Sequence, residues 1–245
     1  MCNEKTRILE PYGDVNVDLL KDFCQAKGIT GHEAGASRVM KKWMEGYVDT
    51  IEYDNLGSIL GTKKGSGNGP KFAMFGHLDE VGFYVKKIED SGFIRVVNAG
   101  GLWPHVLLAQ EVMITTREGK EIYGMISAPA PHGMPAEARA KVMDLNNIYL
   151  DLGLKDKKMA EKLGIRMGDT ITPYQEFRVL NDGVSLLGKA WDDRIAVAAG
   201  ITAGAVTGVL HTMFDIPAIL AGILTQLMLW SINFKIMGKK FGPLM

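Results

Sequence analysis

The chain has 245 residues, of which 47% are hydrophobic and 23% charged, and its 28 basic and 28 acidic side chains cancel. This composition is typical of globular proteins and excludes a disordered chain, a collagen-like repeat and a disulfide-rich miniprotein. A net charge of zero gives no electrostatic reason to expect a nucleic-acid partner. Two cysteines are too few for a disulfide framework and indicate a reducing, cytoplasmic compartment. The early acidic residues and the lack of an apolar core at the N-terminus predict no signal peptide.

Charge is distributed unevenly along the chain. Residues 1–199 carry 25 basic and 27 acidic side chains, whereas residues 200–245 carry three basic and one acidic. A charge density that falls about threefold at one point indicates that two kinds of sequence meet there.

Two helices and a hairpin are predicted first. Apolar residues recur at helical spacing over Asp14–Lys27, and Gly28 follows as a stop signal. Glu33–Tyr47 repeats this pattern, and the next stretch predicts two strands that turn at Asn55–Gly57. After a glycine-rich loop, the apolar run KFAMFGH at 71–77 is typical of a buried strand that delivers a side chain at its carboxyl edge.

Short strand-like runs separated by glycine-containing turns dominate from Val81 to about Thr172. This regular spacing favours a small β-barrel or sandwich over βαβ units. We therefore expect an α/β protein in which a β domain, residues 81–172, is inserted between two α/β pieces, residues 1–80 and 173–199.

The first candidate for chemistry is the sequence His77-Leu78-Asp79-Glu80. Side chains two positions apart in a strand face the same side, so His77 and Asp79 can meet. A carboxylate beside a metal-binding imidazole fixes the tautomer of the ring and increases its basicity. The alternative is a capping aspartate beside a structural histidine, because His-x-Asp is a frequent chance pattern.

The second candidate is the sequence Asp192-Asp193-Arg194. Adjacent carboxylates point in different directions, so one could bridge two cations while Arg194 holds the other. The alternative is a helix N-cap followed by an acid in the first turn. Three loop histidines, His32, His105 and His132, are expected to be solvated, and Cys24 is expected to pack in the core.

Four stretches of the sequence together resemble a known family. They are ITGHEAGASRVMKKWMEGYVDTIEYDNLGSILGTKKG, FGHLDEVGFYV, GMISAPAPH and GKAWDDRIAV. In this order they resemble the tetrahedral dinuclear-metal aminopeptidases, the glutamyl/leucyl and deblocking family once labelled cellulase M. The resemblance runs from about residue 14 to about residue 199, and the β insertion stands where that family has its dimerisation domain.

The resemblance implies a zinc-peptidase-like αβα catalytic lobe that hydrolyses N-terminal residues from peptides with two divalent metal ions, zinc or cobalt. It implies that His77 binds one metal, that Asp79 orients His77, and that Asp192 bridges both metals. Asp193 and Arg194 would support this arrangement. It also implies a homo-oligomer, because members of the family assemble into dodecamers.

Part of the family's machinery has no counterpart in this sequence. The family takes its general base from a Glu-Glu pair that follows the Asp-Asp-Arg motif, and a further acid and a histidine come later. After Asp193 this chain has one acid, Asp215, and one histidine, His211. Because two zinc ions need about three protein ligands each, counting a shared bridge, we expect a truncated lobe that is inactive as written.

The last 46 residues, 200–245, predict an apolar helical segment. The runs Ile195–Phe214 and Ile216–Phe234 hold 20 and 19 residues without a charge, and either is about long enough to cross a hydrocarbon core of roughly 30 Å. The alternative is a pair of buried helices in a soluble enzyme. Residues 202–240 resemble a fragment of the permease of bacterial ABC importers of the branched-chain amino acid type.

Three hypotheses follow from the sequence. The first is a metal-dependent aminopeptidase, truncated and inactive as written. The second is a non-catalytic chimera tethered to a membrane through residues 200–245, and the third is a fragment of an ABC transporter permease. The first is favoured because the two motifs that contain His77 and Asp192 stand in register with the aminopeptidase family.

Overall fold

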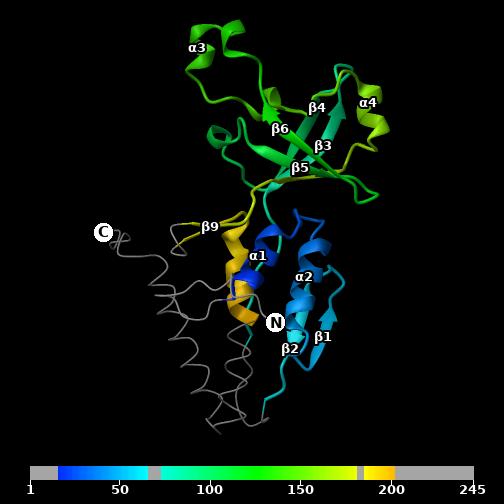
Figure 1. Cartoon of the computed structure of the whole chain (residues 1–245), viewed down its shortest axis with the longest axis vertical. Helices are drawn as coiled ribbons and strands as arrows, with labels where there is room; N and C mark the ends of the chain where they lie inside the picture. Colours follow the sequence, from blue (N-terminus) through cyan, green and yellow to red (C-terminus); the bar gives the residue numbers. More distant parts are fainter. Residues whose placement is uncertain (1–15, 66–72, 181–184, 202–245) are drawn as a thin grey trace, which may run out of the picture.

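The computed structural model describes residues 16–65, 73–180 and 185–201. Two parts lie one above the other in Figure 1, a β-barrel at the top and a group of helices with a β-hairpin below. The chain starts in the lower part, crosses into the barrel after Glu80 and returns below after Pro173. This arrangement confirms the predicted mixed α/β fold with an inserted small barrel.

Two amphipathic helices, α1 (Val17–Gln25) and α2 (Ala34–Met44), form the first layer of the lower part. The side chain of Asn16 caps α1 by accepting a hydrogen bond from the backbone N–H of Leu19 at 3.0 Å. Phe23 of α1 is buried in a cluster that also receives the partly buried Trp43 of α2. Both predicted helices are confirmed, although each ends two or three residues earlier than the apolar pattern predicts.

The hairpin of β1 (Thr50–Tyr53) and β2 (Ile59–Thr62) is antiparallel, as predicted. One carboxylate oxygen of Asp54 accepts the backbone N–H groups of Leu56 and Ser58, each at 2.8 Å. Gly57 has φ +90°, a left-handed conformation that glycine adopts without steric cost. Local turn chemistry therefore fixes this hairpin.

The prediction of a buried strand over residues 71–77 is wrong for the described part of that run. Residues 73–79 are in no strand, and the side chain of Phe75 is 92% exposed. The nearest ladder contact is a parallel bridge between Ile29 and Glu80. A buried strand needs hydrogen-bonded neighbours, and among the described residues nothing pairs with this run.

Six antiparallel strands form a closed barrel in the order β3-β4-β7-β6-β5-β8. They are β3 (Gly82–Ile88), β4 (Ile94–Ala99), β5 (Glu111–Thr115), β6 (Glu121–Ser127), β7 (Tyr149–Asp151) and β8 (Thr170–Pro173). The first and last strands pair with each other, with Phe83 opposite Ile171. Closure removes the unpaired edges that a sandwich of this size would expose.

The barrel has its own hydrophobic core. Alternate residues of its strands point inward, and Ile94, Ile114 and Leu150 are completely buried there. Short helices close the loops between strands: η2 (Pro104–Val106), η3 (Pro131–Gly133), α3 (Ala136–Arg139), η4 (Leu145–Asn147) and α4 (Lys157–Lys162). The regular turns that predicted a small barrel thus correspond to a separately packed unit.

The chain then returns to the lower part through β9 (Arg178–Leu180) and β10 (Ser185–Leu187), which pair antiparallel. Residues 191–201 are helical and pack beside α1 (Figure 1). Cys24 is buried in this region, as predicted, and burial raises the pKa of its thiol to about 11. The thiol is therefore neutral near pH 7 and acts as an apolar core group.

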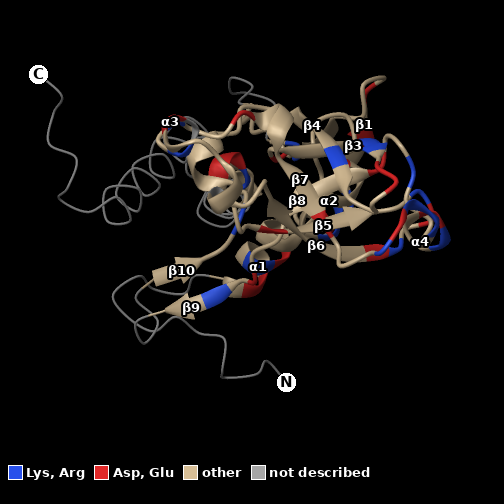
Figure 2. Cartoon of the chain, turned by 90° about the horizontal axis from the view of Figure 1, so that it is seen from above, with Lys and Arg blue, Asp and Glu red and all other residues tan. Residues whose placement is uncertain are grey.

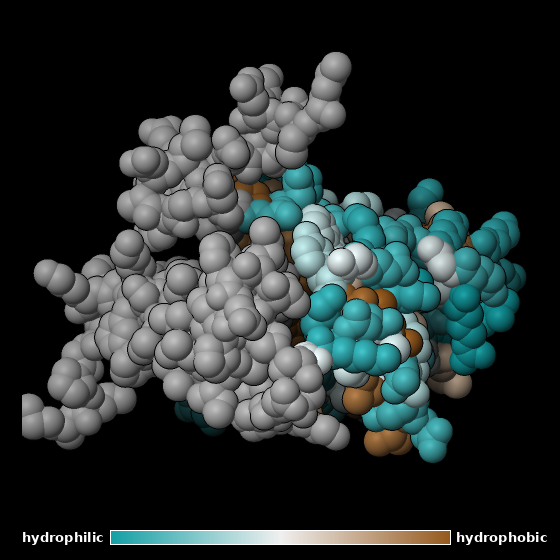
Figure 3. Space-filling model, turned by 90° about the horizontal axis from the view of Figure 1, so that it is seen from below, coloured by the Kyte–Doolittle hydropathy of each residue, from teal (hydrophilic) through white to brown (hydrophobic). Residues whose placement is uncertain are grey.

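In the ribbon of Figure 2, basic and acidic residues are intermixed around α4. From below, the described atoms are mostly hydrophilic with small separate hydrophobic areas (Figure 3). Most of the two uncharged runs predicted near the C-terminus lies outside the described residues. Within residues 16–65, 73–180 and 185–201, no helix combines the length and apolar character needed to cross a bilayer.

We expect Gly82→Ala to lower the free energy of unfolding by about 2 kcal/mol, because overpacking of a tight site costs roughly that much. A methyl group at Gly82 would collide with the carbonyl oxygen of Ile171 and lie 2.9 Å from Cγ2 of Ile29. Gly101→Ala is the control, since a methyl group there meets nothing within 4 Å. Urea denaturation followed by circular dichroism measures the free energy of unfolding of both variants. Equal unfolding midpoints would contradict the conclusion that a methyl group does not fit at Gly82.

Candidate functional site

His77 and Asp79 lie next to each other just before the chain enters the barrel. Nδ1 of His77 is 3.1 Å from Oδ1 of Asp79 and 3.3 Å from the backbone oxygen of the same residue. The predicted contact between these side chains is thus present, although the segment is not a strand. An acceptor at Nδ1 leaves Nε2 as the nitrogen available for a ligand.

Asp192 reaches the same point from the helix at residues 191–201. Its Oδ1 lies 3.3 Å from Nε2 of His77, although the two residues are 115 positions apart in the chain. The side chain of His77 is 54% exposed and that of Asp192 is 97% exposed. The fold therefore brings together an imidazole nitrogen and a carboxylate oxygen that both face solvent.

The distance between these two atoms fits a shared metal ion. Ligands about 2.1 Å from zinc at a tetrahedral angle are about 3.4 Å apart. The pair alone does not make a complete site, because zinc in proteins takes three or four protein ligands. Among the described residues no cluster of three or more histidine, cysteine, aspartate or glutamate side chains is arranged to hold a metal.

The charge around His77 favours its protonated form. Burial works against that form, but the backbone oxygen of Asp79 and the nearby carboxylates, foremost that of Asp79, outweigh it and raise the pKa of His77. Negatively charged and polar oxygens of this kind create a negative electrostatic potential, which attracts any cation, whether a proton or a metal ion. The site is therefore electrostatically suited to a divalent ion.

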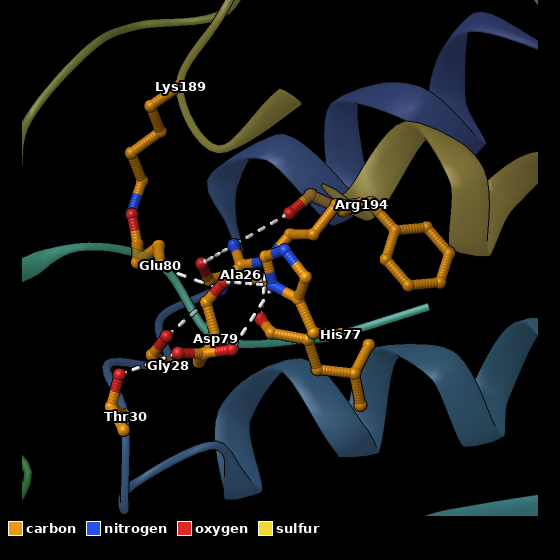
Figure 4. A network of polar contacts seen from close by, with 10 residues as sticks. Ala26, Gly28, Thr30, His77, Asp79, Glu80, Lys189 and Arg194 are labelled. Carbon is orange, nitrogen blue, oxygen red and sulfur yellow. Dashed lines mark hydrogen bonds and ion pairs between the residues drawn. The ribbon is translucent and has the colours of Figure 1, made fainter. Parts of the chain in front are cut away.

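Arg194 occupies a different place from the one predicted. It was expected to hold the neighbouring carboxylate of Asp193, but it is 1% exposed and turns into the protein interior. Its guanidinium donates hydrogen bonds to four backbone oxygens, those of Phe23, Ala26, Gly28 and Leu78 (Figure 4). Among the described residues none of its polar contacts goes to Asp193. The planar five-donor geometry of arginine explains this, because it can satisfy several carbonyl groups at once.

Glu80 and Lys189 complete the buried polar cluster beneath the site. Nζ of Lys189 donates to both carboxylate oxygens of Glu80, at 2.6 and 2.7 Å, and Nη2 of Arg194 lies 3.5 Å from Oε1 of Glu80 (Figure 4). Burial lowers the pKa of Lys189 and of Arg194, and the carboxylate of Glu80 opposes this effect. Two cationic side chains thus surround one buried carboxylate, which gives each buried charge an opposite charge beside it.

The remaining candidates are Asp193 and the three loop histidines. Asp193 lies over Gly76, where an added methyl group would be 3.2 Å from its Oδ2, and the peptide bond that joins it to Asp192 is cis. Two of the loop histidines belong to the barrel domain, His105 in η2 and His132 in η3. His32 contacts Tyr84, with 3.1 Å between Nδ1 and the phenol oxygen.

Three residues near the site received no role from the sequence patterns: Thr30, Lys189 and Glu80, the last of which closes the first candidate motif. The hydroxyl of Thr30 donates to Oδ2 of Asp79 at 2.6 Å. Glu80 stands beside His77 and Asp79 in the sequence, and Lys189 stands three positions before Asp192. This adjacency is the signal that could have drawn attention to Glu80 and Lys189, whereas the contact of Thr30 has no local signature.

We expect Arg194→Lys to lower the free energy of unfolding by about 3 kcal/mol, because lysine keeps the charge but leaves several buried carbonyl groups without a donor. The shift in the urea midpoint measures this loss. Arg178→Lys is the matched control. Arg178 is exposed and pairs with Glu176 at the surface, so a change within about 0.5 kcal/mol is expected. Comparable losses in both variants would contradict the role assigned to Arg194.

Solved structures of similar fold include two TET peptidases. A TET aminopeptidase from a marine sediment archaeon of the Thaumarchaeota is 35% identical, with a TM-score of 0.73, over 77% of this chain and 52% of that chain. The TET1 peptidase of Pyrococcus horikoshii, which can assemble into a tetrahedron or a large octahedral shell, is 27% identical, with a TM-score of 0.64, over 76% of this chain and 55% of that one.

One match is of another kind. A tyrosine transport system permease protein of Clostridioides difficile strain R20291 is 54% identical over 50 residues, which are 20% of this chain and 17% of the permease. The matched protein is a permease, which is the class of protein that residues 202–240 were predicted to resemble.

Sequence comparison assigns most of the chain to one family. The glutamyl aminopeptidase of Lactococcus lactis subsp. cremoris is 31% identical over 179 residues, 72% of this chain and 50% of the relative. The chain spans about half the length of the curated relatives it matches. The profile of the M42 glutamyl aminopeptidase family matches residues 57–207. The chain therefore belongs to the M42 glutamyl aminopeptidase family.

Proposed function

We propose that His77, Asp79 and Asp192 are one half of the dinuclear metal centre of an aminopeptidase that removes N-terminal residues from peptides. The observation that carries the proposal is the 3.3 Å separation of Nε2 of His77 from Oδ1 of Asp192 across 115 positions of sequence. The membership of the chain in the M42 glutamyl aminopeptidase family supports it.

Each residue has a role that follows from its contacts. His77 would bind one metal through Nε2, Asp79 would hold Nδ1 in its protonated form, and Asp192 would bridge two metals with its exposed carboxylate. Bound zinc or cobalt supplies a Lewis acid and lowers the pKa of a coordinated water to about 7. Asp193 would support the bridge from its place over Gly76.

The Glu-Glu pair that supplies the proton transfer to the leaving amine in the resembled family has no counterpart after Asp193 in this sequence. The sequence after Asp193 has Asp215 as its one acid and no glutamate. A carboxylate in hydrogen-bond reach of the reacting water is needed for general base catalysis. We therefore propose that this polypeptide binds metal weakly and does not turn over substrate.

The two parts of the fold suggest a division of tasks. We assign residues 1–80 and 173–199 to the catalytic lobe and residues 81–172 to a domain for assembly into a homo-oligomer. Large hydrophobic side chains on the barrel surface support this role, among them the exposed Trp103, Val106 and Tyr123. The shells formed by the TET1 peptidase of Pyrococcus horikoshii provide the precedent.

A second candidate function concerns residues 200–245. The 50-residue match to a tyrosine permease and the low charge of this segment favour a membrane-tethered chimera with a permease-derived tail. One long sequencing read of the source DNA across codons 185–215 tests this candidate. A continuous reading frame supports it, and a read that departs from this sequence near codon 199 overturns it.

We expect the purified chain to bind Co²⁺ in a calorimetric titration, and His77→Ala and Asp192→Ala each to weaken binding by at least about tenfold, since even the loss of a supporting group costs that much. His105→Ala is the control, because His105 lies in the barrel against Trp103 and should leave the affinity unchanged. Equal affinities in all four proteins would contradict the proposed metal centre.

We expect the chain supplied with Zn²⁺ or Co²⁺ to release no amine from aminoacyl amides, because the family's Glu-Glu pair has no counterpart after Asp193. The assay uses a full-length family relative as the positive control. Metal-dependent turnover that disappears in Asp192→Ala would contradict the predicted inactivity while confirming the location of the site.

A further inference from the structure

The loop at residues 28–32 lies along the segment that contains the proposed metal ligand His77. The backbone N–H of Glu80 donates to the carbonyl oxygen of Gly28 at 2.8 Å, and Ile29 forms a parallel bridge with Glu80. The two segments therefore run side by side, and across this contact the side chain of Thr30 reaches that of Asp79. The inference that follows rests on the proposed function, because it concerns the orientation of His77.

The two carboxylate oxygens of Asp79 have different partners. Oδ2 accepts the hydroxyl of Thr30 at 2.6 Å, and Oδ1 lies 3.1 Å from Nδ1 of His77 (Figure 4). A carboxylate held at both oxygens cannot rotate freely about its Cβ–Cγ bond. The plane of the Asp79 carboxylate, and with it the imidazole of His77, is therefore fixed from the Nδ1 side of the ring, while Nε2 faces Asp192.

Thr30 is itself held by the barrel. Its carbonyl oxygen accepts the phenol hydroxyl of Tyr84, a residue of β3, and the ring of His32 packs edge-on against Tyr84 with centroids 5.6 Å apart. Gly31 has φ +85°, so the chain turns sharply directly after Thr30. The hydroxyl of Thr30 thus has a defined direction, as a positioning contact requires.

We propose that Thr30 is a positioning residue for the metal centre, which acts on His77 through Asp79. Its hydroxyl keeps Asp79 in the orientation in which Oδ1 accepts from Nδ1–H of His77, so that Nε2 faces Asp192. Outer partners of this kind fix the tautomer and direction of a metal-binding histidine.

The test compares Thr30→Val, which keeps the shape but removes the hydroxyl, with Thr30→Ser, which keeps the hydroxyl. We expect Thr30→Val to weaken Co²⁺ binding to the full chain by about tenfold, the lower end of the cost of losing an outer-shell partner, and Thr30→Ser to stay within about twofold of the original chain. Thr62→Val on the exposed strand β2 is the control for a threonine-to-valine change and should bind as the original chain does.

A second readout needs no metal. Nitrogen-15 NMR of histidine-labelled protein, recorded at a pH well above the raised pKa of His77, where the ring is neutral, reports the tautomer of His77. We expect the Nδ1–H form in the original chain and in Thr30→Ser, and a mixture of tautomers in Thr30→Val. Thermal melts establish that each variant is folded, and if Thr30→Val does not fold, the pair Thr30→Ser and Thr30→Ala replaces it in both experiments.

The outcomes separate this inference from the proposed function. An original chain that binds no Co²⁺ overturns the metal centre, and the tautomer of His77 then decides the role of Thr30. Unchanged tautomer and affinity in Thr30→Val overturn the positioning role even where the metal binds. A defect in Thr30→Ser as large as that in Thr30→Val also overturns it, because the hydroxyl would then be irrelevant.

Discussion

The lower part of the molecule depends on one buried guanidinium. The guanidinium of Arg194 donates hydrogen bonds to the carbonyl oxygens at the end of α1 and to that of Leu78. Arg194 itself stands two residues after Asp192 on the helix at 191–201. It therefore ties together three segments that are distant in sequence, and two of them bear the side chains of the site. Buried carbonyl groups need donors, so the same contacts satisfy the end of α1 and determine the spacing of His77 and Asp192.

Local patterns predicted the elements whose determinants are local. The barrel strands, the hairpin at Asp54 and the two helices follow from alternation, turn residues and helical spacing, all of which act over a few positions. The run at 71–77 has an equally apolar pattern, but a strand also needs a partner, and the partner is not adjacent in the sequence. Its exposed Phe75 shows how apolar composition alone overestimates burial.

The sequence motifs drew attention to the two residues that meet at the candidate site, His77 and Asp192, but not to the residues that hold them in place. His77 and Asp192 stand in short motifs that a family resemblance could identify. The roles of Arg194, Glu80 and Thr30 arise from contacts between backbone segments, and no spacing in the sequence encodes which carbonyl or carboxylate each one meets. For Arg194 the neighbouring acid suggested an ion pair with Asp193, but the buried carboxylate of Glu80 and four carbonyl groups offered it more hydrogen bonds.

The pairing of β3 with β8 has a consequence for how such proteins diversify. Because the first and last barrel strands lie side by side, the chain enters and leaves the barrel at a single narrow neck. Loops at the far end can lengthen, shorten or change composition without any displacement of the segment at 77–80. An architecture of this kind lets the barrel change in sequence and shape independently of the part of the fold that holds His77 and Asp192.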